Sequence, residues 1–264
     1  MKIISIINQK GGVGKTTTVI NLASALTQQS KKILVIDLDP QGNATTGLGL
    51  SNTNQSDQTI YGILNGTMSI SNVIKKTKFK NLDLITSNVD LSGLEVETAG
   101  DSDRAFILKS KLTAYLNNSK GFYDYVLIDC PPSLSLLTVM ALVSSNSLLV
   151  PLQTEFFALE GLTQLMKTID RIKVNLNPSL EIQRILLTMY DRRNKLSSQV
   201  EREARDYFKD KVYHTVIPRN VRLSEAPSHG VPVLIYDKSC PGSKSYYNFT
   251  DEFIAQENKI GSAA

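Results

Sequence analysis

The sequence has no tryptophan and holds two cysteines and two histidines among its 264 residues. Cys130 and Cys240 lie far apart and form no Cys-x-x-Cys pair or Cys/His cluster, so nothing suggests a disulfide framework or a zinc site. No apolar run approaches the roughly 18 residues of a membrane span. The apolar start, residues 3–7, is too short for a secretory signal. We therefore expect a cytoplasmic protein.

The charge is small overall and uneven along the chain. The net charge is +4, and a hydrophobic fraction of 41% with 20% charged residues is ordinary for a globular protein. Residues 184–244 hold twelve Lys or Arg and seven Asp or Glu, which gives this segment +5 and the rest of the chain −1. The basic excess is therefore C-terminal. The length allows one α/β domain covering residues 1–264.

Apolar runs alternate with amphipathic segments along most of the chain. The patterns predict strands at 2–8, 32–37, 82–86, 123–129, 147–152, 182–189 and 212–217. They predict helices at 16–27, 105–116, 134–142, 159–174, 197–208 and, at the C-terminus, about 243–257. Strands that are apolar on both faces and alternate with helices favour a doubly wound, mostly parallel sheet with helices on both faces.

Ligands of such sheets bind beyond the carboxyl ends of the strands. The loops after Asn8, Asp37 and Asp129 should therefore converge on one site. The polar stretch 42–57, rich in Gly, Asn and Thr, is predicted to be a loop near that ligand.

The strongest motif is a glycine-rich turn between the first predicted strand and the first predicted helix. A phosphate-binding loop needs small residues whose N–H groups wrap phosphate oxygens, a lysine for the β- and γ-phosphates, and a hydroxyl for Mg²⁺. The helix start adds its positive dipole end. The sequence supplies these groups in Gly11, Gly12, Val13, Gly14, Lys15, Thr16 and Thr17. ATP with Mg²⁺ is the predicted ligand.

The motif departs from the ordinary P-loop, because Gln9 stands where the first glycine is expected and Lys10 is an additional lysine. In this it resembles the deviant Walker A box of the ParA/MinD family of ATPases. The resemblance implies that Lys10 crosses a nucleotide-sandwich homodimer to the partner's ATP, while Lys15 takes the P-loop role.

Three aspartates follow the predicted strands. Asp129 ends an apolar strand, as the carboxylate that acts on Mg²⁺ through water should. By resemblance to the family, Asp39 positions the attacking water and Asp37 helps to hold the Mg²⁺ environment. Asp37 and Asp39 could also simply cap the following turn. Lys10, Lys15 and Asp39 are the predicted catalytic residues, since phosphoryl transfer depends on positioning and charge neutralisation.

Further blocks resemble the chromosome-partitioning, Soj-like branch of the family, at residues 37–45, 155–161, 188–191 and 217–227. The resemblance implies that Pro218 and Asn220 contact the adenine. The start of the chain at the P-loop strand also resembles the chromosomal or small-plasmid branch. By this resemblance we expect a slow ATPase whose ATP-bound dimer binds double-stranded DNA on the nucleoid and is stimulated by a ParB-like partner.

Sequence-independent DNA binding needs only Lys and Arg facing phosphates. Arg219 and Arg222 are the first candidates, because they lie in a family-like block beside the nucleotide. Other candidates are Arg192, Arg193, Lys195, Arg202 and Arg205. No helix-turn-helix or zinc-finger pattern occurs, so no base readout is expected.

Three alternatives remain at this point. A related positioning ATPase could carry another cargo, because the partner decides the cargo. A membrane-cycling division-site regulator would need a basic amphipathic C-terminal helix, whereas residues 251–257 are acidic, so no stable membrane association is expected. A reductase or assembly protein with an iron–sulfur cluster would need bridging thiolates, which Cys130 is badly placed to supply.

Overall fold

A computed structural model describes residues 1–51, 56–118 and 122–263. These residues form a seven-stranded sheet in the order β3-β4-β2-β5-β1-β6-β7. All neighbouring strands are parallel except β3, which is antiparallel to β4. The strands are β1 (Lys2–Ile6), β2 (Ile33–Asp37), β3 (Lys75–Lys76), β4 (Leu82–Ile85), β5 (Tyr125–Asp129), β6 (Ser147–Gln153) and β7 (Glu181–Thr188). The predicted doubly wound, mostly parallel sheet is confirmed.

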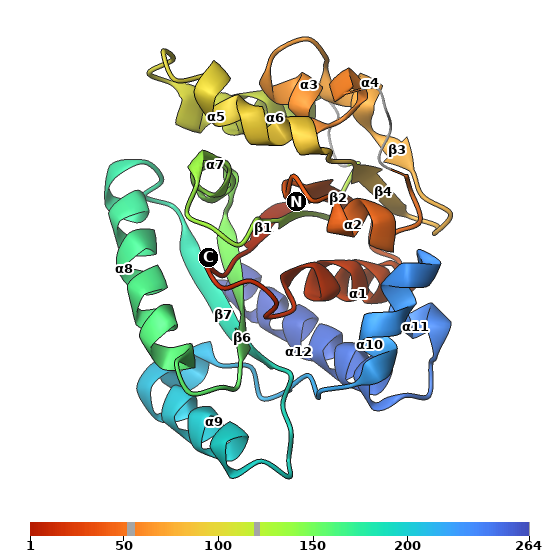
Figure 1. Ribbon diagram of the computed structural model, residues 1–264, viewed down its shortest axis with the longest axis vertical. Coiled ribbons are helices and arrows are strands. Elements are labelled where there is room, and N and C mark those ends of the chain that lie inside the picture. The colour runs from red at the N-terminus through yellow and green to blue at the C-terminus, as the bar shows by residue number, and fades with distance from the viewer. Residues whose placement is uncertain (52–55, 119–121, 264) are drawn as a thin grey trace.

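Helices cover both faces of this sheet, as Figure 1 shows. The α-helices are α1 (Lys15–Gln28), α2 (Asn43–Gly47), α3 (Ile60–Leu64), α4 (Ile70–Val73), α5 (Leu94–Glu97), α6 (Ile107–Asn118), α7 (Leu136–Ser144), α8 (Ala158–Asn175), α9 (Lys195–Phe208), α10 (Val221–Glu225), α11 (Val233–Tyr236) and α12 (Pro241–Ala263). Short 3-10 turns are η1 (Ser56–Gln58), η2 (Val89–Gly93), η3 (Arg104–Phe106), η4 (Lys209–Lys211) and η5 (Ala226–His229).

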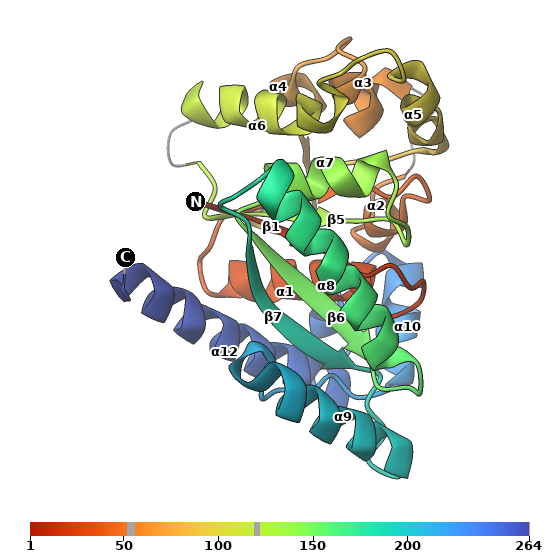
Figure 2. The same cartoon turned by 90° about the vertical axis from the view of Figure 1, so that its left-hand side faces the viewer.

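Alternation along the strands divides the core between the two faces. Ile4 and Ile6 of β1 point to the side of α1, α11 and α12, where the buried aromatics Tyr246, Phe249 and Phe253 pack. Ile3 points to the opposite side, which α3–α7 cover. The outer strands β6 and β7 pack under α8, which crosses them in Figure 2. The two-sided burial explains why the strands are nearly continuous apolar runs.

The strand predicted at 212–217 is wrong. The segment makes only isolated bridges with its neighbours, Ile185 to Val212 and, just beyond it, Tyr190 to Pro218. Backbone bonds to β7 occur only at its ends, where Tyr213 and Ile217 donate to Ile185 and Leu187, and side chains bond the backbone between them. The Arg205 guanidinium donates to the carbonyls of Tyr213 and His214 at 3.0 and 3.1 Å, and the Glu252 carboxylate accepts from the N–H groups of His214 and Thr215 at 2.8 and 2.9 Å. A continuous strand ladder is therefore not needed to satisfy these groups.

The prediction of a loop throughout 42–57 is also wrong, because residues 43–47 form α2. Asp37 explains this helix, since its carboxylate accepts from both the N–H and the hydroxyl of Thr45 at 2.8 and 2.7 Å. Residues 52–55 of the predicted loop lie outside the described residues. Along the described residues, no helix is long and apolar enough to cross a bilayer.

Docking of α12 can be tested by truncating one of its buried rings. Phe249 is fully buried and packs edge to face against Tyr213 at 4.9 Å between centroids. We predict that Phe249→Ala lowers the free energy of unfolding by about 3–5 kcal/mol, because it removes apolar contacts and leaves a cavity. Urea denaturation measures this change. Asn248→Ala, at an exposed position of the same helix, is the control and should change stability by less than about 0.5 kcal/mol.

Candidate functional site

The glycine-rich turn joins β1 to α1 and curls because two of its glycines adopt a left-handed conformation. Gly12 has φ +76° and Gly14 has φ +90°, values that a residue with a Cβ rarely adopts. Gly14 directly precedes the first residue of α1. Thr188, at the end of β7, donates its hydroxyl to the Val13 carbonyl at 2.8 Å and fixes the middle of the turn. The N-terminus of a fourteen-residue helix therefore opens onto the loop.

Lys15 and Thr16 lie at the start of α1 and both have defined partners. The Lys15 ammonium belongs to a residue that is only 6% exposed and donates to the Lys10 carbonyl at 3.0 Å. Burial lowers the pKa of Lys15, and the negative charge of Asp129 partly offsets this. The Thr16 hydroxyl donates to Oδ2 of Asp129 at 2.7 Å. These contacts join the loop after β1 to the end of β5.

Asp37 and Asp39 at the end of β2 have different surroundings. One Asp37 oxygen accepts from the Asp39 N–H at 3.2 Å, and the other accepts the two bonds from Thr45. Asp37 is fully buried, and this burial raises its pKa to about 6 although those hydrogen bonds oppose the shift. Asp39 accepts from the Gln41 N–H at 3.0 Å and lines the hollow at the P-loop. Asp37 therefore supports the loop, while Asp39 faces the space that a ligand would enter.

Asp129 is fully buried beside these groups. Burial, followed by the nearby Asp37, raises the pKa of Asp129 well above its usual range. Its Oδ2 accepts from Thr16, and its Oδ1 has no hydrogen-bond partner among the described residues. A buried acceptor without a donor is costly, so this atom fits a donor that arrives with the ligand.

Two adjoining hollows complete the site. The larger, of about 520 Å³, is lined by the P-loop glycines, Lys15, Thr16, Thr17 and Asp39. The smaller, of about 140 Å³, is lined by Pro218, Arg219 and Asn220, and the two hollows share Gly14, Thr17, Met189, Leu223 and Ser224. The Asn220 side chain also accepts from the Arg222 N–H at 3.1 Å and begins α10. The structure thus brings the predicted phosphate and adenine residues to adjacent spaces.

Lys10 lies outside the lining of the larger hollow. Its ammonium pairs with the Glu155 carboxylate just after β6, and its side chain is 54% exposed. Phe156 and Phe157 follow Glu155 and are 75% and 67% exposed. The sequence motifs include the block 155–161 but indicate no role for Glu155. The ion pair could not be predicted from the sequence, because its two residues lie 145 positions apart and no motif connects them.

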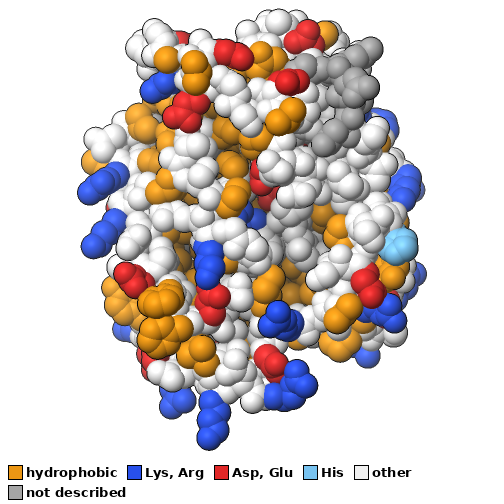
Figure 3. Space-filling model, in the orientation of Figure 1, with side chains coloured by type: hydrophobic (Ala, Val, Ile, Leu, Met, Phe, Trp, Pro, Cys, Tyr) orange, Lys and Arg blue, Asp and Glu red, His pale blue; other side chains and the backbone are white. Residues whose placement is uncertain are grey.

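The candidate DNA-binding residues divide into groups. A shallow hollow at the start of α9 is lined by Arg192, Arg193, Lys195 and Arg202, and Figure 3 shows basic side chains gathered at that lower edge of the molecule. Arg193 is 91% exposed and pairs with Asp191 at 3.0 Å. Arg219 is also exposed. Arg205, by contrast, holds the backbone at 213–214 and lies outside this hollow.

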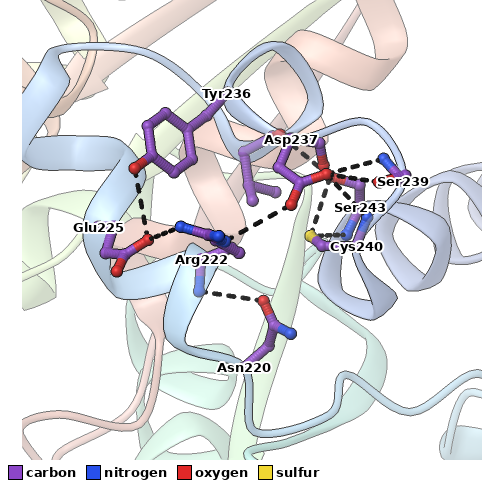
Figure 4. Close-up of polar contacts among 9 residues, drawn as sticks. Asn220, Arg222, Glu225, Tyr236, Asp237, Ser239, Cys240 and Ser243 are labelled. Carbon is purple, nitrogen blue, oxygen red and sulfur yellow. Dashed lines mark hydrogen bonds and ion pairs between the residues drawn. The ribbon is translucent and has the colours of Figure 1, made fainter.

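Arg222 belongs to a polar network that Figure 4 shows. Its guanidinium lies 2.8 Å from Glu225 and 3.5 Å from Asp237, and the Tyr236 hydroxyl donates to the same Glu225 oxygen at 3.4 Å. These carboxylates raise the pKa of Arg222, with Glu225 as the largest cause. Much of the Arg222 charge is therefore neutralised within the chain, which weakens it as a DNA contact relative to Arg219.

Across residues 1–51, 56–118 and 122–263, no three His, Cys, Asp or Glu side chains gather as a metal site.

Comparison with known proteins decides the family. A family model described as "AAA domain" matches residues 1–182. The chromosome partitioning protein ParA of Caulobacter vibrioides is 53% identical over 257 residues, which cover 97% of this chain and 95% of that protein. The chain belongs to the ParA/Soj family of chromosome-partitioning ATPases. Another relative in this family, the sporulation initiation inhibitor protein Soj of Bacillus subtilis, is 48% identical over 96% of this chain and 98% of its own length.

A solved structure agrees with the fold. Cobyrinic acid a,c-diamide synthase of Mycobacterium smegmatis, solved with an ATP analogue and magnesium, aligns with a TM-score of 0.83 at 31% identity and covers 98% of this chain and 96% of that chain. The predicted P-loop ATPase fold and the resemblance to the ParA/MinD family are thus confirmed, and the chain is an ATP-binding ATPase of the ParA family.

Nucleotide binding at the P-loop can be tested at Lys15. We predict that Lys15→Ala weakens ATP binding in the presence of Mg²⁺ by roughly tenfold to a hundredfold, because a charge-assisted bond to phosphate contributes about 1.5–3 kcal/mol. Isothermal titration calorimetry measures the dissociation constant. Lys31→Ala changes the same residue type outside both hollows and should leave affinity unchanged. Parent-like ATP affinity in the Lys15 variant would contradict the P-loop role.

Proposed function

We propose that the chain is an ATP-driven switch for DNA segregation, built as a single domain over residues 1–264. Its ATP-bound dimer binds double-stranded DNA without sequence preference and associates with the nucleoid. A ParB-like partner stimulates slow hydrolysis of ATP and water to ADP and phosphate, and the subunits then leave the DNA. The observation that carries this proposal is the convergence of Lys15, Thr16 and Asp39 at one hollow, with the buried Asp129 bonded to Thr16 and Lys10 exposed nearby.

In this proposal the phosphates occupy the larger hollow. The N–H groups of residues 11–17 and the start of the α1 dipole bind phosphate oxygens. The Lys15 ammonium moves from the Lys10 carbonyl to the β- and γ-phosphates. Pro218 and Asn220, which line the smaller hollow, bind the adenine.

The described residues also fit Mg²⁺. Thr16 would hold the ion through its hydroxyl, which keeps lone pairs while donating to Asp129. The unpaired Asp129 Oδ1 fits a metal-bound water. When bound, Mg²⁺ neutralises the phosphate charge that develops during transfer. A metal contact by Asp37 remains a prediction. Both of its oxygens already accept hydrogen bonds from Asp39 and Thr45, which leaves them less available to a metal.

Hydrolysis then depends on positioning. Asp39 has one oxygen bonded to the Gln41 N–H, which orients the carboxylate at the rim of the hollow. It accepts a hydrogen bond from the attacking water and directs that water at the γ-phosphate. Lys10 of a second subunit supplies positive charge at the same phosphates. An isolated subunit lacks this charge, which supports slow turnover until two subunits and the partner assemble.

Closure around ATP also explains the switch. A dimer that forms only around two ATP molecules doubles the basic surface that one chain offers. Arg192 and Arg219 form the main DNA-contacting set in this proposal, and Arg193 contributes less because Asp191 pairs with it. Arg222 contributes less, because Glu225 and Asp237 neutralise it.

The water-positioning role predicts a variant that is trapped in the ATP state. Asp39→Ala should bind ATP with near-parent affinity and hydrolyse it at least about a hundredfold more slowly, and it should stay on random-sequence duplex DNA. Phosphate release and fluorescence anisotropy with ATP, with ADP and without nucleotide measure the two properties. Asp170→Ala is the control and should preserve hydrolysis, because it removes an exposed carboxylate of α8 outside both hollows. Rapid hydrolysis by Asp39→Ala would exclude the proposed role.

The DNA surface predicts a change in salt dependence. Replacing both Arg192 and Arg219 with Gln should weaken ATP-dependent binding at all sequences alike. It should also flatten the log–log slope of affinity against salt by about 0.9 for each phosphate that the variant no longer neutralises. Arg171→Gln, exposed on α8, serves as the control. An unchanged slope would assign these arginines to roles other than phosphate binding.

A further inference from the structure

A second basic hollow lies far from the nucleotide loops, at the amino ends of β2, β4 and β5. It has a volume of about 490 Å³ and is lined by four lysines and one aspartate, a net of three positive charges. The lysines are Lys32, Lys76, Lys78 and Lys80, and all four are exposed. The nucleotide loops follow the carboxyl ends of β1, β2 and β5, so the two sites lie at opposite ends of the strands. In Figure 1, β3 and β4 lie at one side of the sheet.

A buried framework holds part of this surface in place. The Asp83 carboxylate is 6% exposed and accepts from the Lys76 ammonium and the Tyr123 hydroxyl, each at 2.7 Å. Burial and then Asp83 raise the pKa of the Tyr123 phenol, so the hydroxyl stays a donor. Tyr123 in turn packs edge to face against Phe122 at 4.9 Å between centroids.

Phe122 organises the cations around it. Its ring belongs to a residue that is 45% exposed, and the ammonium groups of Lys32 and Lys76 lie 5.2 and 5.4 Å from its centroid. Cation–π contacts stabilise an ammonium without neutralising its charge. Lys32 and Lys76 therefore converge on one ring although they come from distant parts of the sequence, and the Lys78 ammonium lies 5.5 Å from the Phe79 centroid at the same hollow.

We propose that this hollow binds the phosphate backbone of duplex DNA independently of the nucleotide state. Solitary ammonium groups on flexible stems neutralise phosphates without requiring one fixed geometry, which suits sequence-independent contact. Single-stranded nucleic acid would need a bare aromatic platform for its bases, whereas lysines lie over Phe122. A peptide anchor would likewise need a desolvated aromatic pocket. Duplex phosphates match the described groups better.

This contact is separate from the ATP-dependent surface of the proposed function. It lies at the edge of the sheet away from the nucleotide loops, so closure around ATP does not create it. Its affinity is weak, because four lysines release few counterions compared with a complete dimer surface. The consequence is a small, salt-sensitive affinity for DNA that persists after hydrolysis.

The test uses Lys78→Gln together with Lys80→Gln in the full chain, and random-sequence duplex DNA as the probe. The control is Lys167→Gln together with Lys173→Gln, which removes the same charge from exposed positions on α8. Fluorescence anisotropy between about 50 and 200 mM salt, without nucleotide, with ADP and with ATP, gives affinity and salt slope. We expect the hollow variant to lose at least about threefold in affinity at low salt without nucleotide and with ADP, the states in which the ATP-dependent surface contributes least. Its slope should flatten by up to about 1.8, or about 0.9 per contact, while the control keeps the parent slope.

Unchanged binding by the hollow variant would overturn the proposal and assign the lysines to protection of the sheet edge. A loss confined to the ATP state would also overturn it. So would unchanged DNA binding accompanied by weaker binding to polyglutamate, since the occupant would then be an acidic protein. The ratio of affinities with and without ATP tests the proposed function separately. That ratio should be at least as large in the hollow variant as in the parent, and a parent that gains nothing from ATP would exclude the proposed switch without affecting this hollow.

Discussion

The site depends on two carboxyl groups that are buried side by side at the carboxyl ends of β2 and β5. Asp37 and Asp129 lie on paired strands at the same level of the sheet and are both fully buried. Burial raises the pKa of each, and Asp37 raises that of Asp129 further because neighbouring carboxylates repel. Thr45, Thr16 and backbone N–H groups partly offset the cost by donating hydrogen bonds. The same hydrogen bonds position α2 and the start of α1, so they stabilise both the buried carboxyl groups and the local fold.

This arrangement also sets what the site accepts. Lys15 is the nearby buried cation, and burial lowers its pKa despite the adjacent carboxylates. An arriving polyphosphate adds further negative charge. A divalent cation bound with it would offset this charge, and the unpaired Asp129 oxygen could accept a hydrogen bond from a water on that cation. Magnesium nucleotide is thus a better electrostatic match than the free nucleotide.

Much of the fold was predictable because local signals and burial agree. The strands around β1, β2 and β5 are apolar on both faces, and glycines with positive φ mark the turn after β1. The segment 212–217 also has the apolar pattern of a strand, but side-chain bonds from Arg205 and Glu252 interrupt its backbone pairing with β7. No local pattern reveals such partners. The helix α2 escaped prediction for the same reason, since its Thr45 is held by an aspartate eight residues earlier.

The sequence predicts which residues form the candidate site better than it predicts which side chains they pair with. The P-loop motif and the strand-ending aspartates point to one place by topology alone. The network around Arg222 could not be foreseen, because Glu225 and Asp237 become its partners only when α10 and α11 pack together. The hollow at Phe122 likewise needs β2, β3 and the segment before β5 to meet.

The pair between Lys10 and Glu155 gives the isolated subunit a defined resting position for its most exposed active-site lysine. A partly exposed ion pair contributes little free energy, about 0–1 kcal/mol. The ion pair can therefore position the Lys10 side chain without making its release costly. The proposed move of Lys10 to a second subunit would leave Glu155 as an uncompensated acid beside two exposed phenylalanines, and this would change the charge pattern of the surface. A protein that approaches from solution would meet a different electrostatic face in each state.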